Sequence, residues 1–286
     1  MMNTVEFSKR AMVLLVAAVP LFAQTAEGDR QYAARATGAQ GARAKAAPID
    51  AAIAAYQRAI ADNENDLEAH ARLLRAIRFK GAYVAANADE KKKIYAQAKT
   101  HGDRALAVLG RQLLARGVKP DAPEKTVAAA ARSMNGAGDI YLWDAINWGE
   151  WALAYGKMAA ARQGAADRIR REATIAHLID PKLEMGAPAR VLGRLHDQTP
   201  RIPFITGWAS GKEAKKFLEQ SLQHDPTNKL TLIFLAEALV SADSAAKPRA
   251  VQMLRTAVST PPHPEYLVED AAAIDDARAL LKKWGA

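Results

Sequence analysis

The segment Glu213-Ala-Lys-Lys-Phe-Leu-Glu-Gln-Ser-Leu-Gln-His-Asp-Pro226 determines the fold class expected for this chain. Ala214, Leu218 and Ser221 place a small, a large and a small residue along one face of a helix. Pro226 follows at a point where a helix has to end. The small residues allow two antiparallel helices to approach closely, and the large residue fills the neighbouring groove. The segment therefore predicts one helix of a closely packed antiparallel pair.

The same spacing recurs along the chain and is typical of the second helix of a tetratricopeptide repeat. The matching positions are Ala250, Leu254, Ala257 and Pro262; Ala52, Tyr56 and Ala59; and Ile169, Ala173, Ala176 and Pro181. The next helices carry Leu232, Leu235, Ala236 and Leu239, and His70, Leu73, Leu74 and Ile77. Since one pair cannot bury its own apolar face, we expect about four to five pairs, stacked as an all-α solenoid with a concave surface.

The composition narrows the class of protein further. Of the 286 residues, 50% are hydrophobic, 25% are charged and 6% are aromatic, and none is cysteine. Alanine dominates the apolar fraction and favours helices over strands. The lack of cysteine excludes disulfide scaffolds, thiolate metal sites and thiol catalysis. The net charge of +9 is dispersed along the chain, without a basic stripe of stacking aromatics, so no nucleic-acid partner is expected.

The N-terminus has the pattern of a secretory signal peptide over residues 1–23. Lys9 and Arg10 precede an apolar run over residues 11–22, which is too short to span a bilayer. We expect cleavage near Ala23 and an exported, periplasmic or secreted protein; the alternative is an uncleaved anchor. Residues 24–47, rich in Ala, Gly and Arg, are interpreted as a flexible linker. Residues 48–286 then form the repeat domain.

A cluster of aromatic residues is the first candidate binding site. Three of the five tryptophans lie between positions 143 and 151 of one expected helix. The candidate residues are Trp143, Asp144, Asn147, Trp148, Trp151 and Tyr155. Their spacing places them on nearby faces. One interpretation is core packing of a repeat helix. The other is that part of this stripe lines a ligand cavity, with Asp144 and Asn147 as its polar partners.

The second candidate site is the segment Gly186–Gly211. A helix is expected to begin near Pro188 and to present Arg190, Arg194 and Asp197 about one turn apart. A proline- and glycine-rich loop that contains Trp208 follows. Either the arginines are surface charges with Asp197 as an ion-pair partner, or one of them faces the concave surface and holds a carboxylate.

These two segments also carry a family resemblance. The blocks Asn147-Trp-Gly-Glu-Trp151 and Gly186-Ala-Pro-Ala-Arg-Val-Leu-Gly193, followed by Glu213–Pro226, resemble the periplasmic TRAP-transporter T-component family over roughly residues 139–257. The resemblance implies a secreted helical protein that acts beside a substrate-binding protein in the uptake of organic acids. Family members are often lipoproteins. This chain has no cysteine to lipidate, so no lipid anchor is expected.

Three functions remain open. The leading hypothesis is a binding or adaptor protein with a protein partner, such as a periplasmic solute-binding protein, or a small organic acid as ligand. The second is an enzyme or an accessory enzyme subunit that uses Arg190, His196 and Asp197. The third is a scaffold that only assembles with itself as a homo-oligomer. No histidine pair has metal-binding spacing, and no phosphate loop or nucleophile elbow is present, so neither a metal, a cofactor nor catalysis is expected.

Overall fold

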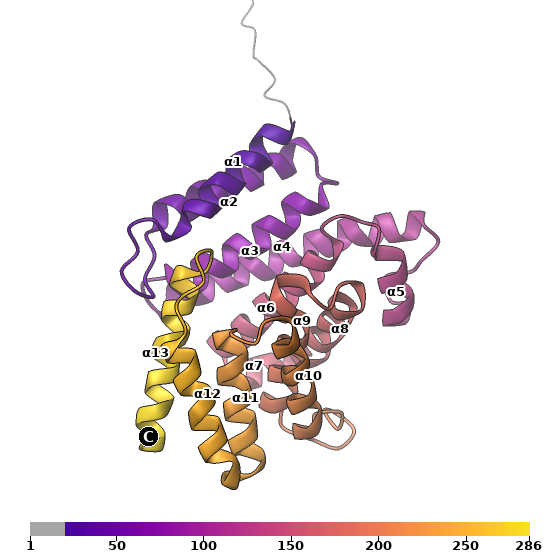
Figure 1. Cartoon of the computed structure of the whole chain (residues 1–286). Coiled ribbons are helices and arrows are strands. Elements are labelled where there is room, and N and C mark those ends of the chain that lie inside the picture. The colour runs from indigo at the N-terminus through magenta and orange to yellow at the C-terminus, as the bar shows by residue number, and fades with distance from the viewer. Residues whose placement is uncertain (1–20) are drawn as a thin grey trace, which may run out of the picture.

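The structure is a computed structural model that describes the backbone of residues 21–286 and the side chains from Gln24 onward. Within this range the chain is helical and forms no β-strand (Figure 1). Its elements are α1 (Leu21–Ala33), η1 (Ala34–Ala36), α2 (Ala46–Asp62), α3 (Leu67–Tyr83), α4 (Ala88–Ala115), α5 (Glu124–Ala131), α6 (Ala137–Tyr155), α7 (Lys157–Arg162), α8 (Ala165–Ile179), α9 (Leu183–Gln198), α10 (Gly211–His224), α11 (Lys229–Ala242), η2 (Ser244–Ala246), α12 (Lys247–Ser259) and α13 (Leu267–Trp284).

Helix boundaries follow ordinary capping chemistry. Asp66, Asn87, Ser210 and Asn228 each precede a helix, and their side chains accept a hydrogen bond from a backbone N–H of the first turn. These caps satisfy donors that have no partner within the helix. They fix where α3, α4, α10 and α11 begin.

The repeat pattern predicted the packing faces correctly. The small and large positions identified in α2, α8, α10 and α12 are all buried, and so are the apolar positions of α3 and α11. Ala214, Leu218 and Ser221, for example, are fully buried. Helices that are neighbours in sequence pack against one another as far as α13, except that the short helix α5 lies mainly against α8. The expected all-α fold of stacked, tetratricopeptide-like helix pairs is confirmed.

The last helix returns to the first elements, so the stack closes on itself. Val268 of α13 belongs to the same core as Tyr32 of α1 and Tyr56 of α2. The guanidinium of Arg35 in η1 donates from Nε to the Glu269 carboxylate at 2.9 Å and from Nη2 to the backbone carbonyl of Glu265. Both ends of this ion pair are largely buried. The N-terminal and C-terminal elements of the described chain are therefore in direct contact.

The segment 24–47 is not the flexible linker that its composition suggested. Most of it lies in α1 and η1, and α1 packs along the length of α2 (Figure 1). Gly28 provides the close contact, because a Cβ there would lie 2.3 Å from the Tyr56 ring. The Tyr56 hydroxyl donates to Asp29 at 2.8 Å. The expected signal peptide falls mostly outside the described residues. Among the residues described, no helix has the length and apolarity to cross a bilayer.

Candidate functional site: a cleft between the two ends of the stack

A cleft lies where the two ends of the stack meet. It has a volume of about 510 Å³, within the range of ligand-binding pockets. Five parts of the chain form it, namely α1 with η1, α3, the start of α6, the start of α9 and the loop before α13. Its lining includes Asp29, Tyr32, Arg35, Glu68, Arg72, Arg75, Gly136, Asp139, Trp143, Glu184, Glu265 and Tyr266.

One wall of the cleft is a tyrosine held between two arginines. The guanidinium carbons of Arg35 and Arg75 lie 4.3 Å and 4.2 Å from the centroid of the Tyr32 ring. Burial raises the pKa of the Tyr32 hydroxyl to about 12. Cation–π contacts of this kind are stronger where water is excluded. They make this wall a fixed surface rather than a mobile one.

The arginines of the cleft already have carboxylate partners. Arg72 lies 3.1 Å from Asp29, and Arg75 lies 3.4 Å from Glu184. Glu184 also accepts a hydrogen bond from the Tyr266 hydroxyl at 2.8 Å, which joins α9 to the loop before α13. These pairs neutralise the positive charge of the cleft.

Among the charged residues that line the cleft, the acidic ones outnumber the basic ones. The lining contains five acidic and three basic residues. Asp139 forms no ion pair among the described residues, and neither does the exposed side chain of Glu265, whose backbone carbonyl accepts from Arg35. Burial, followed by the negative charge of Glu184, raises the pKa of the Asp139 carboxyl. An added cation next to Asp139 would relieve this repulsion.

Two sharp backbone turns, at Gly136 and at Glu184, border the cleft. Gly136 has φ of +80°, and a Cβ there would meet the backbone of Leu67 and Glu68 at 2.9 Å. At the start of α9, Glu184 and Met185 have left-handed φ values of 45° and 57°, which are rare for residues with side chains. The regular part of α9 begins after them, with Pro188 in its first turn as expected. The left-handed turn points Glu184 into the cleft.

The aromatic stripe of α6 divides among three environments. Trp143 lines the cleft. Asn147 and Trp148 are buried, and the Asn147 amide donates to the backbone carbonyl of Leu74 at 3.1 Å, which joins α6 to α3. Trp151 and Tyr155 stack with their ring centroids 4.8 Å apart and border a shallow depression on another face, where the Lys99 ammonium lies 3.9 Å from the Trp151 centroid.

Asp144, predicted as a polar partner of a ligand, lies instead in a buried charge cluster. Its Oδ2 accepts from Arg168 at 2.7 Å, and the same guanidinium donates to Glu172 at 2.9 Å. Burial raises the pKa of both carboxyls, and Asp144 raises that of Glu172 further. Two carboxyl groups that face one arginine in the core cannot both carry a charge at low cost. The cluster therefore joins α6 to α8 and leaves Asp144 no access to the cleft.

The second candidate segment does not line the cleft. Arg190 donates to the carbonyls of Glu184 and Met185 and to the Thr231 hydroxyl at 3.3–3.5 Å, and burial lowers its pKa to about 10. Arg194 forms ion pairs with Asp197 at 3.4 Å and with Glu237 at 2.8 Å.

The other members of that segment lie apart from Arg190. The Trp208 indole donates to Asp167 at 3.0 Å, and its ring packs against His196 at 5.2 Å. His196 also stacks on Phe217 at 5.7 Å. Arg190, His196 and Asp197 therefore do not converge on one cavity. Of the ten candidate residues, only Trp143 lines the cleft.

The remaining cleft residues had no sequence signal. Tyr32, Arg75, Asp139, Glu184 and Tyr266 come from elements that are far apart in the sequence and meet only when the stack closes. In the sequence, Glu184 and Met185 stand just before Gly186 and Pro188. This pattern does not reveal that Glu184 and Met185 adopt a left-handed backbone conformation. Among the described residues, no group of three histidine or acidic side chains is arranged to hold a metal ion.

The fold defines a class, an all-α stack of tetratricopeptide-like helix pairs. No protein-family model matches the chain, and no curated protein matches it. Among solved structures, the chain is similar to yeast Tom70 at 12% identity and a TM-score of 0.30, over 96% of this chain and 68% of that chain.

Proposed function

We propose that this protein is an exported helical-repeat adaptor that binds a segment of a protein partner in the cleft between the two ends of its stack. The observation that carries the proposal is the cleft itself. Its walls come from five separate parts of the chain and are fixed by ion pairs and stacked side chains. A preformed hollow of this kind loses little entropy when a partner binds.

The charge of the cleft favours a basic side chain from the partner. Asp139 and Glu265 have no ion-pair partner among the described residues, whereas Arg72 and Arg75 do. The half-buried Trp143 beside Asp139 adds an aromatic surface. A lysine or arginine could contact the indole and the carboxylate together, which is a favourable arrangement for a cation.

The blocks that resemble the TRAP-transporter T-component family suggest the pathway in which the adaptor acts. We propose that the partner is the periplasmic solute-binding protein of a TRAP-type uptake system for organic acids. The N-terminal signal pattern supports export to the compartment where such receptors work. The adaptor would contact the receptor protein, and the receptor would hold the acid.

Direct capture of a small organic acid is less favoured by the geometry. A free carboxylate would have to displace Asp29 from Arg72 or Glu184 from Arg75. It would also enter next to Asp139, whose carboxyl already has a raised pKa. Ion pairs made in advance by the protein compete with a carboxylate ligand for the same guanidinium groups.

An affinity pull-down from the envelope fraction of the source organism tests the proposal. Wild type is compared with a cleft variant, Asp139→Asn with Trp143→Ala, and with Leu153→Ser, a substitution of an exposed leucine of α6 outside the cleft lining. We expect wild type and Leu153→Ser to retain a solute-binding protein and the cleft variant to lose it about tenfold or more. Equal recovery by all three proteins, or recovery only of further copies of this chain, would contradict the proposal.

A further inference from the structure

The loop between α9 and α10 exposes a group of large apolar side chains. Phe204 is fully exposed at 107%, and Ile205 and Ile202 are exposed at 66% and 46%. We call these three residues the apolar tip. Single exposed apolar residues are common on protein surfaces, but three within four positions of one loop are not. The tip has no part in the cleft described above.

Hydrogen bonds within the loop hold the tip in this exposed position. Thr206 donates from its hydroxyl to the carbonyl of Pro200 and accepts from the backbone N–H of Ile202 at 3.0 Å. The backbone N–H of Thr206 donates to the carbonyl of Ile202 at 2.9 Å. Phe204 has a left-handed φ of 64°, which a bulky residue adopts only when its surroundings impose it.

The base of the loop is fixed to the helices. Trp208 donates to Asp167 of α8, packs against His196 of α9 and lies under the guanidinium of Arg170 at 4.8 Å. The tip is therefore a protruding apolar surface on a rigid base, not a loose loop that could fold back onto the core.

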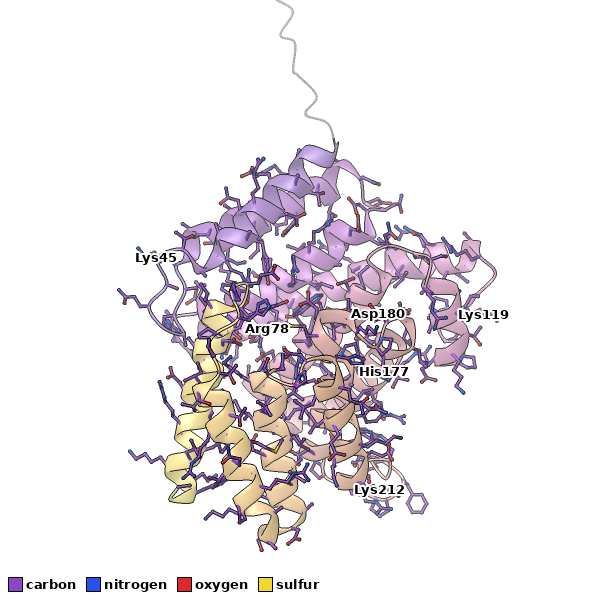
Figure 2. All side chains as sticks on the ribbon, in the orientation of Figure 1. Lys45, Arg78, Lys119, His177, Asp180 and Lys212 are labelled. Carbon is purple, nitrogen blue, oxygen red and sulfur yellow. The ribbon has the colours of Figure 1, made fainter. Side chains whose placement is uncertain are left out.

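Basic residues flank the tip in the sequence. Residues 199–216 contain four basic residues, Arg201, Lys212, Lys215 and Lys216, and one acidic residue, Glu213. Glu213 pairs with Lys216, whereas Arg201 and Lys212 are exposed and form no ion pair within the described part of the chain. Figure 2 shows Lys212 at the end of the molecule farthest from the start of α1.

We propose that the apolar tip inserts into the headgroup region of an anionic lipid bilayer, with Arg201 and Lys212 against the lipid phosphates. A protruding tip needs a partner that deforms around it, and a bilayer does so without a complementary pocket. The flanking cations match the negative potential of an anionic membrane surface. Since the proposal rests on the loop alone, it is independent of the function of the cleft.

Tryptophan fluorescence with brominated lipids tests the proposal in the full chain. Phe204→Trp is compared with Leu153→Trp, which places a new indole at an exposed site on α6. Vesicles of brominated phosphatidylcholine, with and without about a third phosphatidylglycerol, supply the surface. We expect the emission added by Phe204→Trp to fall about twofold on the anionic vesicles, and that added by Leu153→Trp to stay unchanged.

A second comparison tests whether the charges of Arg201 and Lys212 contribute to membrane binding. Arg201→Ala with Lys212→Ala should lower the partition onto anionic vesicles about thirtyfold, since each cation near such a surface contributes about a factor of five. Absence of quenching at 204 overturns the proposal. Equal quenching at 153 also overturns it.

Discussion

Two buried carboxyl groups, Asp144 and Glu172, face one guanidinium between α6 and α8. Asp144 is fully buried and Glu172 is 5% exposed. Asp144 Oδ1 and Glu172 Oε2 each receive no hydrogen bond from a donor in the structure. Because burial and the neighbouring Asp144 raise the pKa of Glu172 well above its usual range, we expect Glu172 to be the carboxyl of the pair that holds a proton and Asp144 to pair with Arg168.

This assignment predicts how stability depends on pH. A raised pKa means that the folded chain holds a proton which the unfolded chain releases above about pH 4.5, so the stability of wild type falls as pH rises from there. Glu172→Gln removes this titration and keeps the shape of the side chain. Urea unfolding at pH 5 and at pH 8 should show the variant gaining about 1 kcal/mol relative to wild type for each pH unit over part of this interval.

The controls for that experiment distinguish the effect of the Glu172 proton on stability from the effect of side-chain packing. Asp144→Asn leaves the Arg168 guanidinium without its closest carboxylate, at 2.7 Å, and should destabilise the chain at both pH values by about 3 kcal/mol. If the difference between Glu172→Gln and wild type were the same at pH 5 and pH 8, Glu172 would be ionised in the folded protein.

A neighbouring glycine makes room for this cluster. A Cβ at Gly102 of α4 would lie 1.7 Å from Asp144 Oδ1, whereas a Cβ at Gly149 of α6 would meet nothing within 4 Å. Gly102→Ala should cost about 2–4 kcal/mol in urea unfolding, because the buried Asp144 carboxyl group has to shift away from the new methyl group. Gly149→Ala is the matched control and should be neutral or stabilising by up to about 1 kcal/mol. Equal effects would mean that α4 does not lie as close to α6 as described.

Single helices were the part of the structure that sequence reasoning predicted best. Periodic positions such as Ala214 and Leu218 reveal a buried face because one helix carries the whole signal. The segment 24–47 was misjudged because its packing depends on Gly28 meeting Tyr56, a contact between two helices that no local pattern indicates. Asp144 was predicted to face a ligand because Arg168, which pairs with it in the core, lies 24 residues further along the chain. A local sequence pattern does not indicate that pairing.

The left-handed start of α9 is held by the side chain of Arg190. Arg190 donates to the carbonyls of the left-handed residues Glu184 and Met185. Arg190→Met removes the donor to these partly buried carbonyls and should cost about 1–3 kcal/mol in urea unfolding. Arg194→Met, which removes a partly exposed pair with Glu237, should cost about 1 kcal/mol or less. A larger cost at 194 than at 190 would contradict this assignment.

At the scale of the whole molecule, the cleft exists because the two ends of the stack meet. Its residues could not be predicted from sequence, since they are distant along the chain and share no motif. Trp143 was found through the aromatic cluster alone. Tyr266, Glu184 and Tyr32 become neighbours only through the closing contact of η1 with α13.

That closing contact can be tested by one substitution. Arg35→Met breaks a largely buried pair with Glu269 and removes the donor to the Glu265 carbonyl. We expect a loss of about 2–4 kcal/mol and faster hydrogen exchange in the first turns of α13. Arg30→Met, which removes an exposed pair in α1, should change stability by less than about 1 kcal/mol. Unchanged exchange in α13 after Arg35→Met would mean that the stack closes without this contact.

The central claim is that the cleft between the two ends of the stack holds a protein partner. Site-specific photo-crosslinking tests it most directly, with benzoylphenylalanine placed at Trp143 inside the cleft and at Leu114, a 55% exposed residue of α4 outside the cleft lining. Irradiation in the source organism should link the chain to a solute-binding protein from position 143 and not from position 114. A partner that crosslinks at 114 and never at 143 would contradict the account.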